Sequence, residues 1–343
     1  MLSSTSNSNG RIPPGTWGRT WLLAAVLFAA LLAGYEATWR GLGFTPSIND
    51  GPDAWAVARD RVRPDSVVFA GTSRIQADLD PGVWAESWAA RPVQLAISGG
   101  SPLPVLEQLS RDPTFRGTVI LDALPRMLFD TEKDREKLVS RWLRSYRKTH
   151  RSPARTSEAR LRIPLTANLV STRLSPWQFF GRSFLRSDLS RIPYATMGTN
   201  RFMQLDFNKV DLNQRIDVIY HQVQEQGQPA VGTEIEETLQ RIERAVSKIR
   251  SRGGNVVLVH FPHDGKIRDL ENELYPRATY WDALVARVDA PAIHFADEPA
   301  LSAYRCPDGS HLDVRDTADF TRDLADLVRE RLAPTFCRAS TEE

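Results

Sequence analysis

Cysteine is scarce in this chain of 343 residues, which has two, Cys306 and Cys337, both close to the C-terminus. At most one disulfide bond can therefore form within the chain. In an oxidising compartment that bond would tie the C-terminal tail to the segment around Asp308 and His311. Two unpaired thiols are an equal alternative, because the sequence does not give the Cα separation that a disulfide requires.

A strong excess of one charge is also lacking. Lys and Arg number 44 against 42 Asp and Glu, and the net charge of +2 is too small to indicate a nucleic-acid partner, so we expect none. Apolar residues make up 41% and charged residues 25%, as in an ordinary globular protein. The length allows one large α/β domain with an insertion, or two domains.

A standard metal-binding pattern is absent as well. Residues 260–264 (His-Phe-Pro-His-Asp) bring His260 and His263 close to an aspartate, but the spacing is not that of a zinc site and no further ligand cluster accompanies it. We therefore expect no metal and no cofactor. The two histidines are expected to line a polar substrate pocket or to lie on the surface.

The chain has one long apolar run, residues 17–39. Its only charge between positions 20 and 38 is Glu36, and about 20 such residues span a hydrocarbon core of about 30 Å. Aromatic residues stand at both ends, as in the belts of membrane spans: Trp17, Trp21, Tyr35 and Trp39. A cleaved signal peptide fits less well, because Tyr35 is bulky for the last position before a cleavage site.

The run therefore predicts an uncleaved transmembrane anchor. A leader rich in Ser, Asn, Gly and Pro, residues 1–16, precedes it and is expected to be disordered. Arg11 and Arg19 precede residues 20–38, the stretch whose only charge is Glu36, whereas Arg40 after it is accompanied by acidic residues. This asymmetry predicts an N-terminus in the cytoplasm and a large domain outside it. Residues 40–53 combine Pro, Asn, Asp and Gly and predict a linker.

Short apolar segments alternate with helical patterns through residues 54–335, and a tail of residues 336–343 follows. The expected strands are 67–70, 93–97, 119–121, 256–260 and 292–295. The expected helices are 53–62, 81–88, 103–109, 234–250, 280–288 and 317–332. Apolar strands each followed by a helix predict a doubly wound α/β domain with a parallel sheet covered on both faces. Ligands bind such a sheet at the C-terminal ends of its strands.

Residues 130–231 break this alternation and predict a basic helical insertion between the third and fourth strands. Residues 131–191 hold 15 Lys and Arg against 5 Asp and Glu, so they carry +10 and leave −8 for the rest of the chain. The insertion is either a solvated helical surface or a contact for anionic glycan or lipid headgroups. Its aromatic residues fit sugar stacking, a membrane interface or a core: Trp142, Trp177, Phe179 and Phe180.

Two short motifs carry the chemistry. Residues 71–74 (Gly-Thr-Ser-Arg) follow the first expected strand, and residues 308–311 (Asp-Gly-Ser-His) precede the last helix. A serine hydroxyl needs an adjacent base, and the base needs an orienting partner. The spacing predicts Ser73 as nucleophile, His311 as general base and Asp308 as its partner. The alternatives are a serine that caps a helix and a histidine satisfied at a helix start.

An oxyanion that develops at the substrate carbonyl needs preorganised donors. The loop of residues 98–101 (Ser-Gly-Gly-Ser) follows the second expected strand and can supply backbone N–H groups, in particular those of Gly99 and Gly100. The amide of Ser73 is a further candidate.

With these motifs the chain resembles the SGNH/GDSL hydrolase superfamily over residues 65–125 and 254–332. It looks closest to the membrane-anchored bacterial branch with a Gly-[Thr/Ser]-Ser-Arg first block, whose members take part in alginate O-acetylation and teichoic acid D-alanylation. The resemblance implies a flavodoxin-like three-layer α/β/α sandwich with a five-stranded parallel sheet. It also implies the roles of Ser73, His311 and Asp308, with Gly99 or Gly100 as the second-block glycine.

The chain departs from the family pattern in two blocks. Gly-Asp-Ser-Leu is replaced by Gly-Thr-Ser-Arg, and the third block, which usually supplies an Asn to the oxyanion hole, has Asp122 and no Asn within residues 121–125. An ionised Asp122 cannot donate a hydrogen bond. Either backbone amides suffice, or Arg74 or another side chain substitutes, or catalysis is weak.

The expected function is that of a serine O-acyl esterase or O-acyltransferase, held by a single span in the inner membrane of a bacterium with its domain in the periplasm. Its expected partners are an acylated envelope polysaccharide or another acyl ester, the membrane, and a multi-span acyltransferase. The alternative is an inactive glycan-binding module that assists a membrane-embedded acyltransferase.

Overall fold

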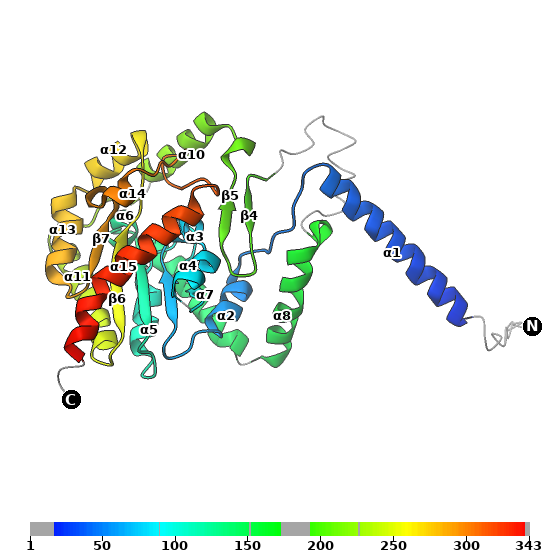
Figure 1. Cartoon of the computed structure of the whole chain (residues 1–343), viewed down its shortest axis with the longest axis horizontal. Helices are drawn as coiled ribbons and strands as arrows, with labels where there is room; N and C mark the ends of the chain where they lie inside the picture. Colours follow the sequence, from blue (N-terminus) through cyan, green and yellow to red (C-terminus); the bar gives the residue numbers. More distant parts are fainter. Residues whose placement is uncertain (1–16, 89, 151, 173–192, 226, 340–343) are drawn as a thin grey trace, which may run out of the picture.

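The computed structural model describes residues 17–88, 90–150, 152–172, 193–225 and 227–339. The predicted disordered leader, the second half of the predicted C-terminal tail (residues 340–343), and Trp177, Phe179 and Phe180 of the insertion lie outside these residues. Figure 1 shows a sheet domain surrounded by helices, from which one long N-terminal helix projects.

A sheet of five parallel strands forms the centre of the domain, as predicted. The strands are β1 (Val67–Ala70), β2 (Val93–Gln94), β3 (Thr118–Asp122), β6 (Asn255–His260) and β7 (Ala292–His294), in the spatial order β2-β1-β3-β6-β7. The order reverses beside β1, which is the point where doubly wound sheets bind ligands. The predicted strand 93–97 is too long, because β2 ends at Gln94, although the amides of Leu95 and Ile97 still donate to the carbonyls of Phe69 and Gly71.

Helices cover both faces of the sheet. Those on one face are α2 (Pro52–Arg59), α5 (Leu103–Arg111), α7 (Asp134–His150), α11 (Thr233–Arg250) and α13 (Arg277–Arg287). Those on the other are α3 (Ser73–Asp78), α4 (Pro81–Trp88), α14 (Pro299–Ser302) and α15 (Thr317–Ala339). Successive side chains of a strand point to opposite faces, so Val68 joins the first group and Phe69 the second.

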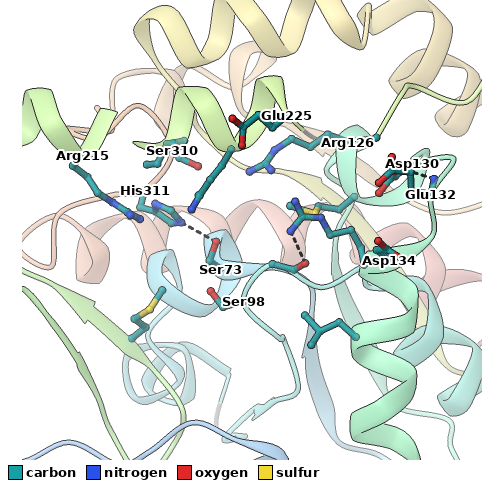
Figure 2. A pocket seen from close by; sticks show the side chains of 18 of the residues that line it. Ser73, Ser98, Arg126, Asp130, Glu132, Asp134, Arg215, Glu225, Ser310 and His311 are labelled. Atoms are coloured by element: carbon teal, nitrogen blue, oxygen red, sulfur yellow. Dashed lines mark hydrogen bonds between the residues drawn. The ribbon is translucent and has the colours of Figure 1, made fainter. Parts of the chain in front are cut away.

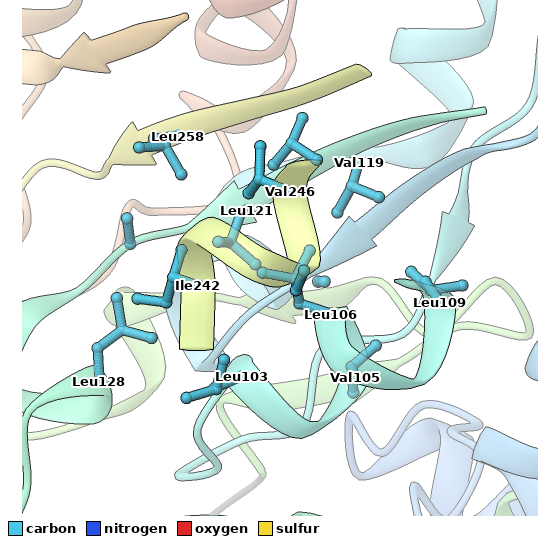
Figure 3. Packing of buried hydrophobic residues seen from close by; sticks show 14 of the residues in the cluster. Leu103, Val105, Leu106, Leu109, Val119, Leu121, Leu128, Ile242, Val246 and Leu258 are labelled. Carbon is cyan, nitrogen blue, oxygen red and sulfur yellow. The ribbon is translucent and has the colours of Figure 1, made fainter. Parts of the chain in front are cut away.

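The first of these cores shows why the apolar pattern predicted the fold. Leu103 and Leu106 of α5 and Ile242 and Val246 of α11 meet side chains from the strands, such as Leu121 (Figure 3). Burying a side chain of this size contributes about 1.5–3 kcal/mol relative to its exposed state. The core therefore fixes the strand ends on which the site is built.

The segment between β3 and β6 is not wholly helical, which corrects the prediction. It contains α6 (Pro125–Leu128), α7, α8 (Pro153–Asn168), η1 (Val170–Thr172), η2 (Phe207–Lys209), α10 (Leu212–Gln224) and α11. It also contains a two-stranded antiparallel ribbon of β4 (Ala195–Met197) and β5 (Met203–Leu205). Strands of three residues are too short to show a period in the sequence.

The remaining helices follow the fourth strand of the main sheet. They are α12 (Gly265–Leu274) and the short η3 (Phe295–Asp297). Phe295 was predicted as the last residue of the fifth strand, but it is the first residue of η3. Ile267 and Leu270 of α12 pack on Ile219 and Val223 of α10. This contact attaches the inserted segment to the sheet domain.

The N-terminal helix α1 (Trp17–Gly41) is, among the described residues, the one helix long and apolar enough to cross a membrane. Most of its side chains are exposed. Trp39 is an exception, since it is buried against Phe44 and Val170. The prediction of Trp39 as part of an aromatic belt is therefore wrong, because its ring packs between α1 and η1.

The predicted linker, residues 40–53, is docked on the domain. Ile48 donates its amide to the Met197 carbonyl, and Met197 donates to the Ser47 hydroxyl. Asp50 accepts two hydrogen bonds from Arg201, at 2.6 and 2.9 Å. The segment therefore holds the end of α1 against the β4–β5 ribbon.

Candidate active site

Ser73 is the first residue of α3, directly after β1. Thr72 is the N-cap of this helix, and its hydroxyl accepts a hydrogen bond from the Arg74 amide. A side chain at Gly71 would overlap Cβ of Asp122 and the Ile75 side chain, so only glycine lets the turn approach β3 this closely. The turn thus presents the Ser73 hydroxyl at the C-terminal edge of the sheet.

The structure brings the three predicted catalytic residues together. Nε2 of His311 lies 2.9 Å from Oγ of Ser73, and Nδ1 lies 3.0 Å from Oδ2 of Asp308 (Figure 2 shows the serine–histidine contact). An ionised carboxylate can only accept, so the ring proton lies on Nδ1 and Nε2 accepts from the serine hydroxyl. This is the arrangement that a general base requires before it removes the Ser73 proton.

Asp308 is held as an anion at the base of its loop. Its Oδ1 accepts the amides of Ser310 and His311 at 2.9 and 2.8 Å, and Gly309 has the positive φ of 80° that closes the turn. Burial acts to raise the pKa of Asp308, but the neighbouring ring, the amide bonds and Arg215 lower it below its ordinary value. Nε of Arg215 lies 3.5 Å from Oδ2.

Ser73 and His311 open into a cleft of about 740 Å³. One side of the cleft is formed by the loops that follow β1 and β2, and the other side by the segment between β3 and β6. Figure 2 shows Arg126 and Arg215 pointing toward Ser73 and His311, with acidic side chains farther from the serine. The lining side chains that carry a charge are Arg126, Arg135, Arg141 and Arg215, and Asp130, Glu132, Asp134 and Glu225.

Two backbone amides of the cleft remain as candidate oxyanion donors. Neither the Ser73 nor the Gly99 amide donates to an acceptor within the described part of the chain, and both residues line the cleft. Gly99 has a φ of 70°, which suits glycine. Gly100 is different, because its amide donates to the Ile97 carbonyl at 2.9 Å. The prediction of Gly100 as a donor is therefore wrong.

Arg74 does not reach the cleft, contrary to its prediction as an oxyanion or substrate residue. It is fully buried, and its Nη2 lies 2.8 Å from each carboxylate oxygen of Glu271. Its Nε donates to the Ser310 hydroxyl at 3.2 Å. Arg74 therefore joins the nucleophile turn to the loop that carries His311, and its role is to position them.

His260 and His263 are also away from the cleft, which corrects their prediction as pocket or surface residues. Both are buried and pack with His294 and Phe295. Burial is the main cause that lowers the pKa of His263 to about 3, and it lowers the pKa of His260 well below its ordinary value. These rings are neutral core side chains at neutral pH.

Asp122 occupies the third-block position and faces the back of the nucleophile turn. Its Oδ2 accepts both the amide and the hydroxyl of Thr72, at 3.1 and 2.5 Å. Burial raises the pKa of Asp122, although the bonds from Thr72 act in the opposite direction. Asp122 thus fixes the residue before Ser73 and is not a substitute for the missing Asn donor.

Cys306 is buried and has no disulfide partner among the described side chains. It lies in the second core group, two residues before Asp308, and its amide donates to Asp264 at 2.8 Å. The side chain of Cys337 lies outside the described residues, so the disulfide with Cys337 stays a prediction.

Sequence reasoning missed Arg126 and Arg215. Both belong to segments after β3 where no motif marks a site, and Arg215 lies on an ordinary amphipathic helix, α10. The basic charge of the predicted insertion was counted over residues 131–191, which include neither of these arginines, so it gave no signal for them. No group of three or more His, Cys, Asp or Glu side chains in the described ranges is arranged to hold a metal ion.

Comparison with known proteins identifies no family for this chain. No protein-family model matches the chain, and no curated protein is significantly similar to it.

Proposed function

We propose that this protein is a serine O-acyl esterase or O-acyltransferase of the SGNH type. One observation carries the proposal: an uninterrupted hydrogen-bond chain from Ser73 through His311 to Asp308, with contacts of 2.9 and 3.0 Å, at the edge of an open cleft. A serine that merely capped a helix would not need a histidine and a buried carboxylate behind it.

The surroundings of the triad support the same assignment. The serine follows the first strand, the glycine loop follows the second, and the Asp-x-x-His turn precedes the last helix, as in the superfamily that the sequence resembles. The parallel sheet with helices on both faces agrees with the three-layer α/β/α sandwich of that superfamily. The fold alone does not identify a reaction, so the triad remains the basis of the proposal.

In the proposed reaction, Oγ of Ser73 attacks the carbonyl carbon of an acyl ester while Nε2 of His311 takes the serine proton. Asp308 stabilises the imidazolium that forms. Collapse of the tetrahedral intermediate breaks the ester bond, and His311 returns the proton to the departing alcohol. Water or a second hydroxyl group then attacks the acyl carbon while Nε2 of His311 takes its proton. The bond between the acyl carbon and Oγ of Ser73 breaks, and His311 returns the proton to Oγ, which restores the free serine.

The amides of Ser73 and Gly99 are proposed to hold the oxyanion. In related sites each such donor contributes about 3 kcal/mol to transition-state stabilisation. The Ser73 amide is also at the N-terminus of a helix, where negative charge is favoured. Arg126, which is paired with Glu271 at 2.7 Å, adds a cation to the lining of the same cleft.

We further propose that α1 anchors the protein in the bacterial inner membrane, with the catalytic domain in the periplasm and an acylated envelope polysaccharide as substrate. A cleft of this size with four arginines and four acids fits a polar chain better than a lipid acyl group. Release of the acyl group to water makes the enzyme an esterase. Release to a sugar hydroxyl makes it a transferase that works with a multi-span acyltransferase.

Hydrolysis of p-nitrophenyl acetate by the full chain tests the proposal. We expect a burst of p-nitrophenol, one equivalent per enzyme, because acylation of Ser73 precedes hydrolysis. The Ser73→Ala variant should lose the burst, whereas Ser98→Ala, at an exposed serine lining the same cleft, should keep it. Equal slow hydrolysis by all three proteins would instead support an inactive glycan-binding module.

A further inference from the structure

Helix α8 lies on the side of the domain from which α1 projects (Figure 1). Two exposed leucines form an apolar stripe on its surface. Leu161 and Leu165, one helical turn apart, are 68% and 55% exposed. Ala159, on the opposite side of the helix, is 2% exposed. The inner face packs on α2 and α7, so the stripe faces away from the protein.

Arginines flank this stripe. Arg162 lies on one side of it and is paired with Asp53 at 2.8 Å, and Arg160 lies on the other, 3.9 Å from Asp60. Arg155 is exposed about two turns before Arg162, and Glu158, one turn before Leu161 on the same face, is the only acid of the helix. Over these two turns, exposed leucines with arginines on both sides are similar to the lipid-facing side of a helix that lies in the surface of an anionic membrane.

The end of α8 is fixed to the end of α1. The Glu36 carboxylate accepts the amides of Val170 and Ser171 at 2.7 and 3.0 Å, and Arg40 donates to the Asn168 carbonyl at 2.7 Å. Since about 20 residues cross the hydrocarbon core, a span that begins near Trp17 leaves it near Glu36. Residues 168–171 are then at the level of the lipid headgroups.

We propose that α8 lies on the bilayer surface, with Leu161 and Leu165 among the upper acyl chains and the arginines at the lipid phosphates. This inference rests on the membrane anchoring proposed for α1 but not on the proposed chemistry. Charge complementarity and continuity with the span favour a lipid surface over a protein partner. Because α7 packs on α8 and its Arg135 bonds to the Gly99 carbonyl, the contact would fix the height of the cleft above the membrane.

Fluorescence quenching by lipid tests this contact. The full chain, carrying Cys337→Ser and one reporter cysteine labelled with bimane, is placed in nanodiscs of equal parts phosphatidylcholine and phosphatidylglycerol. A minor share of the lipid carries a nitroxide just below its headgroup. The reporter is Leu161→Cys, and Val231→Cys is the matched control, because Val231 is 67% exposed and precedes α11, across the domain from α1 (Figure 1).

A third labelled variant, Phe28→Cys in α1, reports on the anchor itself. We expect loss of fluorescence at positions 161 and 28 and none at 231, and a weaker loss at 161 when phosphatidylglycerol is omitted. Quenching at 28 without quenching at 161 overturns the role of α8 and leaves the anchor in place. No quenching at 28 overturns both, and neither result bears on the triad.

Discussion

Two loops bring histidines to the same edge of the sheet, but only one of them meets a serine. His311 lies between Ser73 and a buried carboxylate and faces an open cleft. His263, after β6, is buried among aromatic rings with its Nε2 3.8 Å from Glu271, a carboxylate already occupied by two arginines.

The comparison shows which surroundings would allow a histidine to act as a general base. Both loops lie at the C-terminal edge of the sheet, so this position alone does not determine whether a histidine can act as a base. His311 has a carboxylate of its own and access to a nucleophile, whereas burial of His263 removes the charged form from the accessible pH range. Substitutions in the two loops should therefore affect different properties of the protein.

The largest effect is expected from Asp308→Asn. An amide at this position can donate to Nδ1, which forces the proton to Nε2 and leaves Ser73 without a base. The rate of acylation should fall by about 10⁴-fold, as in other triads that lose this carboxylate. Stopped-flow measurement of the p-nitrophenol burst checks this, and a fall of less than tenfold would show that Asp308 does not orient His311.

A smaller effect is expected from Arg215→Gln. The Arg215 cation is one cause of the lowered pKa of Asp308, so its loss should raise that pKa and shift the acid limb of the pH–rate profile toward higher pH. An ion pair of this exposure corresponds to about 1 kcal/mol, or a several-fold loss of kcat/KM. Arg215→Lys should keep the acid limb of the pH–rate profile at its wild-type position. An acid limb that does not move in Arg215→Gln would show that Arg215 does not influence Asp308.

The smallest effect on activity is expected from His263→Gln, which should change kcat/KM by less than about twofold. Its effect should instead be on stability. Burial lowers the pKa of His263 from 6.5 to about 3 in the folded protein. Below pH 6.5 the unfolded chain therefore binds a proton at this histidine that the folded chain does not bind, and the free energy of unfolding falls as the pH drops. The variant should show a shallower fall of the melting temperature between pH 6.5 and 4. An unchanged slope, or a loss of activity like that of Asp308→Asn, would contradict this assignment.

The main sheet could be predicted because its strands are continuous apolar runs. β1 begins and ends at the predicted residues. Ser73 comes shortly after this strand and His311 shortly before the last helix, so the sequence could place both at the same edge of the sheet, where they meet. The β4–β5 ribbon could not be predicted, since three-residue strands have no detectable period.

The direction of individual side chains could not be predicted either. Arg74 is adjacent to the nucleophile in sequence, but its partner Glu271 lies 197 residues away, and that contact turns the guanidinium into the interior. The Gly100 amide likewise donates to the Ile97 carbonyl within a local turn, whereas the Gly99 amide beside it has no such bond among the described residues. Such choices depend on tertiary partners that no local motif contains.

Labelling with a fluorophosphonate probe tests the central claim most directly. The full chain is treated at neutral pH, digested and analysed by mass spectrometry, with His311→Gln and His263→Gln treated in parallel. We predict one labelled serine, Ser73, in the wild-type and His263→Gln proteins, and almost none in His311→Gln. Absence of label on Ser73 in the folded wild-type protein, or equal labelling in His311→Gln, would contradict a catalytic triad at this site.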